Sequence, residues 1–138
     1  MTTADSIPTG VADILSDRVL GRTLVCTCGR DHEVHTREAV IARGVAGRVG
    51  EILPTRIAGT RCLVVADTRT WDVAGGDVAS GLEAAFEVSR LVLDDGPDGH
   101  IHASVALVDE MESTCRDEFD FYLAVGSGTV NDLTKELA

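Results

Sequence analysis

Two glycines near the end of the chain, Gly126 and Gly128, have the spacing of a turn that binds phosphate. The apolar run 121–125 precedes them, and a helical pattern begins at Val130. Glycines allow backbone N–H groups to approach a phosphate closely, and the N-terminus of the following helix contributes partial positive charge. The sequence therefore indicates a nucleotide cofactor. Because the chain ends at Ala138, soon after this helix begins, we expect the rest of an enzyme to be missing.

A purely structural interpretation of this turn is also open. Glycine pairs often serve only a tight strand-to-helix turn, and Thr129 and Asp132 have the spacing of a helix-capping pair. Capping accounts for those two residues without a ligand, but it does not account for two glycines at the carboxyl end of a strand. The distance to Lys135 excludes a P-loop, and the segment is not a Gly-x-Ser-x-Gly nucleophile elbow.

The second candidate for cofactor binding is Asp67, which directly follows the apolar run 62–66. Ligands of open parallel sheets bind at the carboxyl ends of the strands, where a carboxylate can accept hydrogen bonds from two ribose hydroxyls. In the usual Rossmann fingerprint the glycines come first and the acid follows, whereas here the acid comes first. We therefore weigh ribose binding by Asp67 against a simpler role, in which the side chain caps the next turn.

Four residues near the N-terminus have side chains of the kinds that bind zinc: Cys26, Cys28, His32 and His35. Alternate residues of a strand share a face, so the two cysteines could face an ion together. The Cys-x-Cys spacing is not the usual Cys-x-x-Cys knuckle, however, and no second cysteine pair follows. We favour a half-buried hairpin and assign no metal ligand.

No group of residues has the spacing of a catalytic site. His100 and His102 share a face if their segment is extended, but the turn residues before them predict that both are exposed. Neither paired carboxylates nor a Cys or Ser with a neighbouring base can be argued from spacing. We therefore assign no catalytic residue to this chain.

The elements that must position these residues follow from hydrophobic periodicity and turn residues. We expect residues 1–20 to form a polar segment with a short helix over 11–20, and residues 21–138 to form one α/β domain that begins with a hairpin over 23–34. The predicted strands are 62–66, 89–93 and 119–125, and the predicted helices are 36–53, 78–87, 103–116 and the segment from 130 onward. Strands that alternate with helices predict a Rossmann-like parallel sheet with crossover helices, joined to an N-terminal β-hairpin.

The composition limits the class of partner and the compartment. The net charge of −11 argues against nucleic acid and anionic membranes as partners, since phosphate backbones require clustered Lys and Arg. The chain begins without a basic and apolar leader, and no stretch approaches the ~20 apolar residues of a membrane span. We expect a cytoplasmic protein in which Cys26, Cys28, Cys62 and Cys115 are thiols.

Three segments resemble the bacterial AraM-like glycerol-1-phosphate dehydrogenases: Cys26-Thr27-Cys28-Gly29-Arg30-Asp31-His32, Asp67-Thr68-Arg69-Thr70-Trp71, and Ala124-Val125-Gly126-Ser127-Gly128-Thr129-Val130-Asn131-Asp132-Leu133-Thr134-Lys135. These enzymes belong to the iron-containing alcohol dehydrogenase and dehydroquinate synthase-like fold, in which the acid precedes the glycine turn. The resemblance covers about residues 21–138.

This resemblance implies an NAD- or NADP-dependent oxidoreductase that interconverts dihydroxyacetone phosphate and sn-glycerol 1-phosphate. It implies that Asp67 binds the adenosine ribose and that Asp132 lies near the nicotinamide end. Asp67 would favour NAD over NADP by repelling a 2′-phosphate, and Arg69 could offset that. The residues implied to line the pyrophosphate are Gly126, Ser127, Gly128, Thr129 and Val130.

The resemblance also implies a divalent metal, which is zinc, nickel or iron. Its ligands, one Asp and two His, lie in a helical C-terminal domain that this chain lacks, so we expect the chain alone to be inactive. The full-length enzyme would take a small phosphorylated polyol or ketone and form a homo-oligomer. A dehydroquinate synthase-like cyclase and a non-catalytic nucleotide-binding or interaction module remain as alternatives.

Overall fold

The computed structural model describes residues 18–138, and the chain divides into two compact units, Met1–Arg43 and Gly44–Ala138. We describe each unit by itself. Most of the polar segment 1–20 and of the helix predicted over 11–20 lies outside the described residues; residues 18–21 form a turn. None of the helices in the described part of the chain is long and apolar enough to cross a membrane.

The first unit contains the predicted hairpin, which is confirmed. Strands β1 (Thr23–Val25) and β2 (Asp31–Glu33) pair in antiparallel register, with Leu24 opposite His32. Gly29 has a φ of +81° in the connecting turn, a conformation that side chains disfavour. The prediction of a half-buried hairpin was wrong, because Leu24 is the one partly buried residue of the two strands and the other five are exposed.

The helix predicted over 36–53 was also wrong. Residues 34–42 form no helix or strand, and helical structure begins only with the short elements η1 (Val45–Arg48), α2 (Val49–Ile52) and η2 (Leu53–Thr55). Gly44 takes a φ of +70°, which no helix accepts, so its conformation separates the two halves of the apolar pattern. Gly50 is required for packing, since an added Cβ would lie 1.9 Å from the carbonyl oxygen of Gly81.

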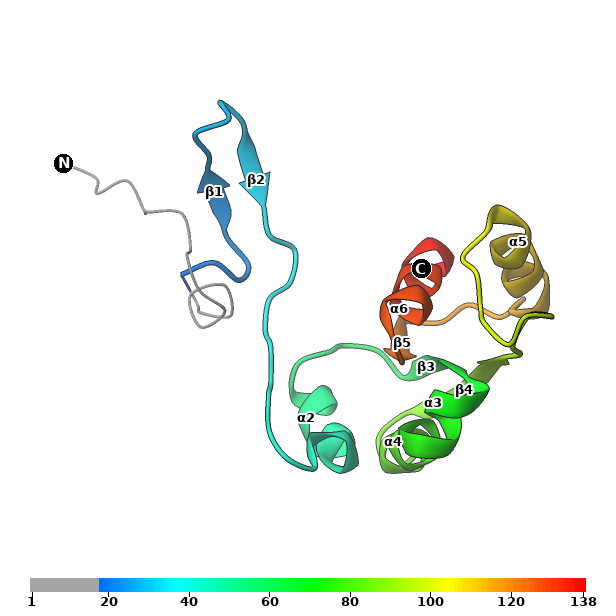
Figure 1. Ribbon diagram of the computed structural model, residues 1–138. Coiled ribbons are helices and arrows are strands. Elements are labelled where there is room, and N and C mark those ends of the chain that lie inside the picture. The colour runs from blue at the N-terminus through cyan, green and yellow to red at the C-terminus, as the bar shows by residue number, and fades with distance from the viewer. Residues whose placement is uncertain (1–17) are drawn as a thin grey trace. The chain divides into compact units, whose positions relative to one another are not determined.

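The second unit is built on three parallel strands in the order β4-β3-β5 (Figure 1). They are β3 (Arg61–Asp67), β4 (Glu87–Leu93) and β5 (Phe121–Val125). β3 lies in the centre, and its residues 62–66 are fully buried, which explains their continuous apolar character. The predicted α/β class and Rossmann-like parallel sheet are thereby confirmed.

Helices cover both faces of this sheet. After β3 the chain forms a continuous helical segment of α3 (Thr68–Thr70), the π-helix η3 (Trp71–Gly75) and α4 (Gly76–Leu82), which starts ten residues before the predicted position 78. α5 (Val105–Thr114) connects β4 to β5, and α6 (Gly128–Leu137) follows β5. Cys62 and Val64 pack with α4 on one face, whereas Leu63 and Val65 pack with α5 and α6 on the other.

Candidate nucleotide-binding site

The sheet brings the two predicted binding segments together. Ala66 of β3 lies opposite Val125 of β5 in the parallel register, so Asp67 and Gly126 follow on neighbouring strands at the same edge. Although the two residues are far apart in sequence, their strands are adjacent because β5 pairs with the central strand and not with β4. The carboxyl edge of the sheet therefore holds both candidate segments side by side.

This edge has the topology at which open α/β sheets bind ligands. The helical segment after β3 packs on one face of the sheet through Val78 and Leu82. The helix after β5 packs on the opposite face through Val130 and Leu133. Two adjacent strands whose following helices leave to opposite faces open a crevice at their carboxyl ends, and ligands of such folds bind there.

Asp67 caps the helix that follows it. Its Oδ1 accepts a hydrogen bond from the backbone N–H of Thr70 at 2.7 Å, and the Oγ1 of Thr70 accepts one from the N–H of Asp67 at 3.0 Å. This reciprocal capping box explains why the helix begins at Thr68 and not near residue 78. Capping occupies Oδ1 alone, and Oδ2 of Asp67 has no partner among the described residues.

Gly126 is required by packing within the protein. A Cβ at this position would lie 2.8 Å from Cγ2 of Val130 and 3.3 Å from Oγ1 of Thr70. The turn therefore folds back on its own helix and against the Asp67 cap. Sequence reasoning gave no role to Thr70, which joins the two segments; the Asp-x-x-Thr spacing of a capping box was the available signal.

Gly128 differs from Gly126, because neither packing nor backbone conformation requires a glycine there. A Cβ on Gly128 would meet no atom within 4 Å, and Gly128 is not among the glycines with positive φ. The space over this residue is open, and both Ser127 and Gly128 are exposed. Since the fold itself does not require glycine at this position, close approach of a ligand to the backbone is a reason for glycine here.

The N-terminus of α6 is not capped by any side chain. The alternative interpretation, in which Thr129 caps this helix, does not hold, because the helix begins at Gly128 with Ser127 at the cap position and Thr129 lies inside the first turn. The first intrahelical bond runs from the N–H of Asn131 to the carbonyl oxygen of Ser127 at 3.0 Å. The N–H groups that precede it have no intrahelical acceptor, so they are available to an anion.

Arg69 borders this edge, but its charge is neutralised by a partner. Its Nη2 donates to Oδ1 of Asp95 at 2.9 Å and to the carbonyl oxygen of Gly99 at 3.0 Å. Both partners lie in the loop after β4. The guanidinium is thus held toward that loop by two hydrogen bonds.

The other candidates from the sequence lie outside this edge. His102 bonds to Asp98 through Nε2 and Oδ2 at 2.7 Å, and both His100 and His102 are exposed as predicted. In the hairpin unit, Cys26, Cys28 and His32 bring their ligand atoms within 4.8 Å of one another, and His35 is not part of this group.

A family model for the iron-containing alcohol dehydrogenases matches residues 40–138, most of the chain and all of the second unit. The chain belongs to the iron-containing alcohol dehydrogenase family. Neither a curated protein nor a solved structure matches it.

Membership in this family indicates an alcohol dehydrogenase-like oxidoreductase, a class that typically uses a nicotinamide dinucleotide and a metal. The edge formed by β3 and β5 fits the dinucleotide, since it offers uncapped N–H groups, open space over Gly128 and a carboxylate oxygen. The second unit does not fit the metal: across residues 44–138 no three His, Cys, Asp or Glu side chains gather as ligands.

Proposed function

We propose that this chain is the NAD(P)-binding portion of a glycerol-1-phosphate dehydrogenase-like oxidoreductase. The observation that carries the proposal is Gly128, a glycine with open space above it at the uncapped start of α6. It lies at a topological switch point beside Asp67, where this class of fold binds its ligands. The family match supports an oxidoreductase, and the resemblance of the motifs supports the narrower class.

In this proposal the glycine turn binds the pyrophosphate through the backbone. The N–H groups at the start of α6 donate to the phosphate oxygens, and the helix dipole favours their negative charge. Val130 contributes only its backbone, because its side chain is buried against Leu133 and the sheet. Ser127 and Thr129 complete the turn, with Ser127 exposed and Thr129 half-buried.

Asp67 binds the adenosine ribose in this proposal. One carboxylate oxygen holds the helix cap, which fixes the orientation of the side chain, and the other is left to accept from ribose hydroxyls. A fixed acceptor loses little conformational entropy when the ligand arrives. The same negative charge repels a 2′-phosphate, and Arg69 is already paired with Asp95, so the site favours NAD over NADP.

The reaction proposed is the interconversion of dihydroxyacetone phosphate and sn-glycerol 1-phosphate, for which the bound nicotinamide supplies or accepts the hydride. The second unit orients the dinucleotide through the glycine turn and Asp67. Asp132 is assigned to the nicotinamide end by the resemblance; in the structure it is exposed on α6 with Lys135 as its ion-pair partner. We assign no step to a metal, because no three possible metal ligands gather within residues 44–138.

The test is a titration of the chain with NADH, read through Trp71 and through the melting temperature. Trp71 begins η3, directly after the helix that Asp67 caps, so a ligand at this edge lies close to it. We expect saturable quenching together with a raised melting temperature, since a ligand that binds only the folded state stabilises it.

The matched variants are Gly128→Asp and Gly47→Asp. An aspartate at the start of α6 interacts favourably with the helix dipole but repels a pyrophosphate. We therefore expect NADH affinity to fall about tenfold or more, while the free energy of unfolding stays at or above that of the parent chain. Gly47 also has nothing within 4 Å of its Cβ position, and its variant should bind NADH like the parent chain. Absence of NADH binding by the folded chain, or equal binding by Gly128→Asp, would contradict the proposal.

A further inference from the structure

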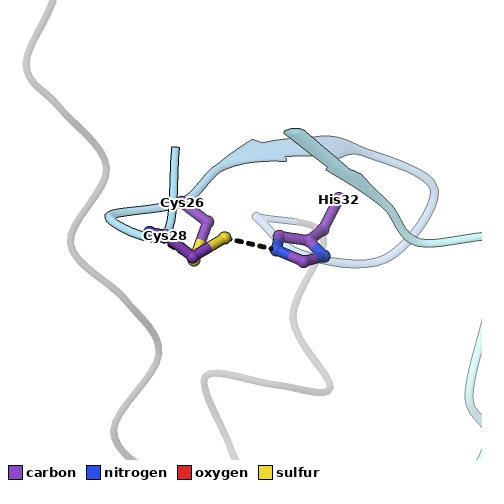
Figure 2. A group of neighbouring side chains, drawn as sticks. All are labelled: Cys26, Cys28 and His32. Atoms are coloured by element: carbon purple, nitrogen blue, oxygen red, sulfur yellow. Dashed lines mark hydrogen bonds between the residues drawn. The ribbon is translucent and has the colours of Figure 1, made fainter. Parts of the chain in front are cut away.

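The hairpin of the first unit holds a compact group of metal-binding side chains. Sγ of Cys28 lies 3.1 Å from Nε2 of His32, and Sγ of Cys26 completes a set whose ligand atoms all lie within 4.8 Å of one another. Figure 2 shows the two cysteines together on the turn, with the imidazole of His32 reaching toward them from the neighbouring strand. No part of the proposed dinucleotide site involves these residues.

The strand register explains how the group forms. Leu24 and His32 lie opposite each other, so their side chains share a face of the hairpin. Cys26 is two residues beyond Leu24 and lies on the same face, diagonal to His32. The turn at Gly29, with its φ of +81°, then folds Cys28 back toward the pair. The ligand set therefore depends on hairpin pairing and not on helical or knuckle spacing.

The spacing of the ligand atoms suits zinc. A tetrahedral zinc with Zn–S bonds of about 2.3 Å and Zn–N bonds of about 2.0 Å holds its ligand atoms roughly 3.5 to 3.8 Å apart. The ligand atoms of this group lie within 4.8 Å of one another, with Sγ of Cys28 and Nε2 of His32 at 3.1 Å, so small side-chain adjustments reach this spacing. Two thiolates would neutralise the charge of the ion. The N–H of Cys28 also donates to Sγ of Cys26 at 3.5 Å, the kind of outer hydrogen bond that supports a metal thiolate.

The two strands of the hairpin bury little apolar surface. Each strand has three residues, and five of the six are exposed, including Val25 at 82%. A two-stranded hairpin of this kind is marginal at best in water. An ion that joins the turn to the return strand would close this hairpin, because its ligands come from both.

We propose that Cys26, Cys28 and His32 bind one zinc ion that braces the hairpin. Among the described residues no fourth ligand joins the group, since His35 lies outside it with its Nδ1 paired to Glu33 at 3.6 Å, and we assign the fourth position to water. The site is independent of the proposed dinucleotide site, which belongs to the other unit of the chain.

The test is an anaerobic titration of the reduced, untagged chain with Co²⁺, followed by displacement with Zn²⁺. Cobalt reports its ligands directly, through sulfur-to-cobalt charge-transfer bands and the intense visible bands of a tetrahedral site. We expect one cobalt per chain, displaced by one zinc. The variants Cys26→Ser, Cys28→Ser and His32→Ala should each weaken cobalt binding by about a hundredfold or more, as removal of a ligand costs at least as much as removal of its outer partner.

Two matched variants control for nonspecific binding. His35→Ala removes the histidine of the same segment that lies outside the group, and Cys115→Ser removes a partly buried thiol of the other unit. Both should bind cobalt like the parent chain. The proposal is overturned if the chain shows no thiolate-cobalt bands, if the three ligand variants bind like the parent, or if a Cys26–Cys28 disulfide forms and Zn²⁺ does not protect the thiols from it.

Amide hydrogen exchange and NADH binding complete the test. Zinc should increase protection of the β1 and β2 amides in the parent chain and leave it unchanged in Cys28→Ser, whereas equal protection with and without zinc would contradict the bracing role. The ligand variants should bind NADH like the parent, and Gly128→Asp should bind cobalt like the parent. Failure of one proposal is thereby distinguished from failure of the other.

Discussion

Nη2 of Arg69 lies 2.9 Å from Oδ1 of Asp95, and this ion pair joins the helix after the central strand to the loop after β4. The carbonyl oxygen of Gly99 accepts from the same nitrogen at 3.0 Å. The guanidinium is more than half exposed, so the pair contributes little to stability. The ion pair matters for the choice of ligand, because Arg69, the basic residue closest to Asp67 in sequence, is held by the carboxylate of Asp95.

The first prediction concerns the choice between NAD and NADP. Asp95→Asn removes the charge that holds Arg69 and leaves the guanidinium able to meet a 2′-phosphate. We expect the affinity for NADPH relative to NADH to rise several-fold in this variant and not in the double variant with Arg69→Ala. Fluorescence titrations with both cofactors measure the ratio. Asp94→Asn, an exposed neighbour in the same loop, is the control, and an equal effect there would refute the assignment.

The second prediction separates the two roles of Asp67. Asp67→Ala removes the cap of α3 and should lower the free energy of unfolding by about 1 kcal/mol, whereas Asp67→Asn keeps a capping oxygen and should lower it by a few tenths. Both variants lose the charged acceptor for ribose, so both should weaken NADH binding. Thermal or denaturant melts measure the contribution of the cap to the free energy of unfolding, and titration with NADH measures the change in affinity. Parent-like NADH binding by Asp67→Asn would leave capping as the whole role of this residue.

The third prediction compares the two glycines of the turn. Gly126→Ala places a methyl group 2.8 Å from Val130 and should destabilise the chain by about 1–3 kcal/mol, the usual cost of overpacking. Gly128→Ala meets nothing and should leave stability unchanged or raise it by up to about 1 kcal/mol, the helix propensity of alanine over glycine. Urea melts of both variants measure the difference. Equal destabilisation would mean that the two glycines serve the same packing purpose.

The fourth prediction concerns Asp120, whose Oδ2 accepts from the N–H groups of Thr60 at 2.6 Å and Arg61 at 2.8 Å. These hydrogen bonds to the ionised form hold the pKa of Asp120 below its ordinary value of 3.8. A lowered native pKa contributes stability that is fully present above the ordinary pKa and is lost as pH falls through the native value.

We therefore expect Asp120→Asn to melt below the parent chain at neutral pH, with the gap narrowing as pH falls under about 4. Melting temperatures across this range measure the gap. Glu118→Gln, which changes an exposed carboxylate of the same loop, is the control variant. A gap for Asp120→Asn that stays constant with pH would mean that the charge of Asp120 is not what stabilises the start of β3.

Much of the fold was predictable because its signals are local. The strands were predicted from short apolar runs such as 62–66, because a strand that is buried on both faces has apolar residues at every position. The turn after β5 and the acid after β3 were each visible in a few consecutive residues. The helix prediction over 36–53 was wrong because the spacing of apolar residues does not reveal the backbone conformation of each residue. Gly44, inside this pattern, adopts a φ of +70°.

The sequence by itself determined the three strands of the sheet and the helices α5 and α6, since the apolar patterns of these segments are local. Only the tertiary structure placed Ala66 opposite Val125, and this pairing brings Asp67 beside the glycine turn. It also separated Gly126, which is packed against Val130, from Gly128, which faces open space. Register and packing are properties of segments distant along the chain, and the energy that selects them comes from burial of the whole sheet between its helices.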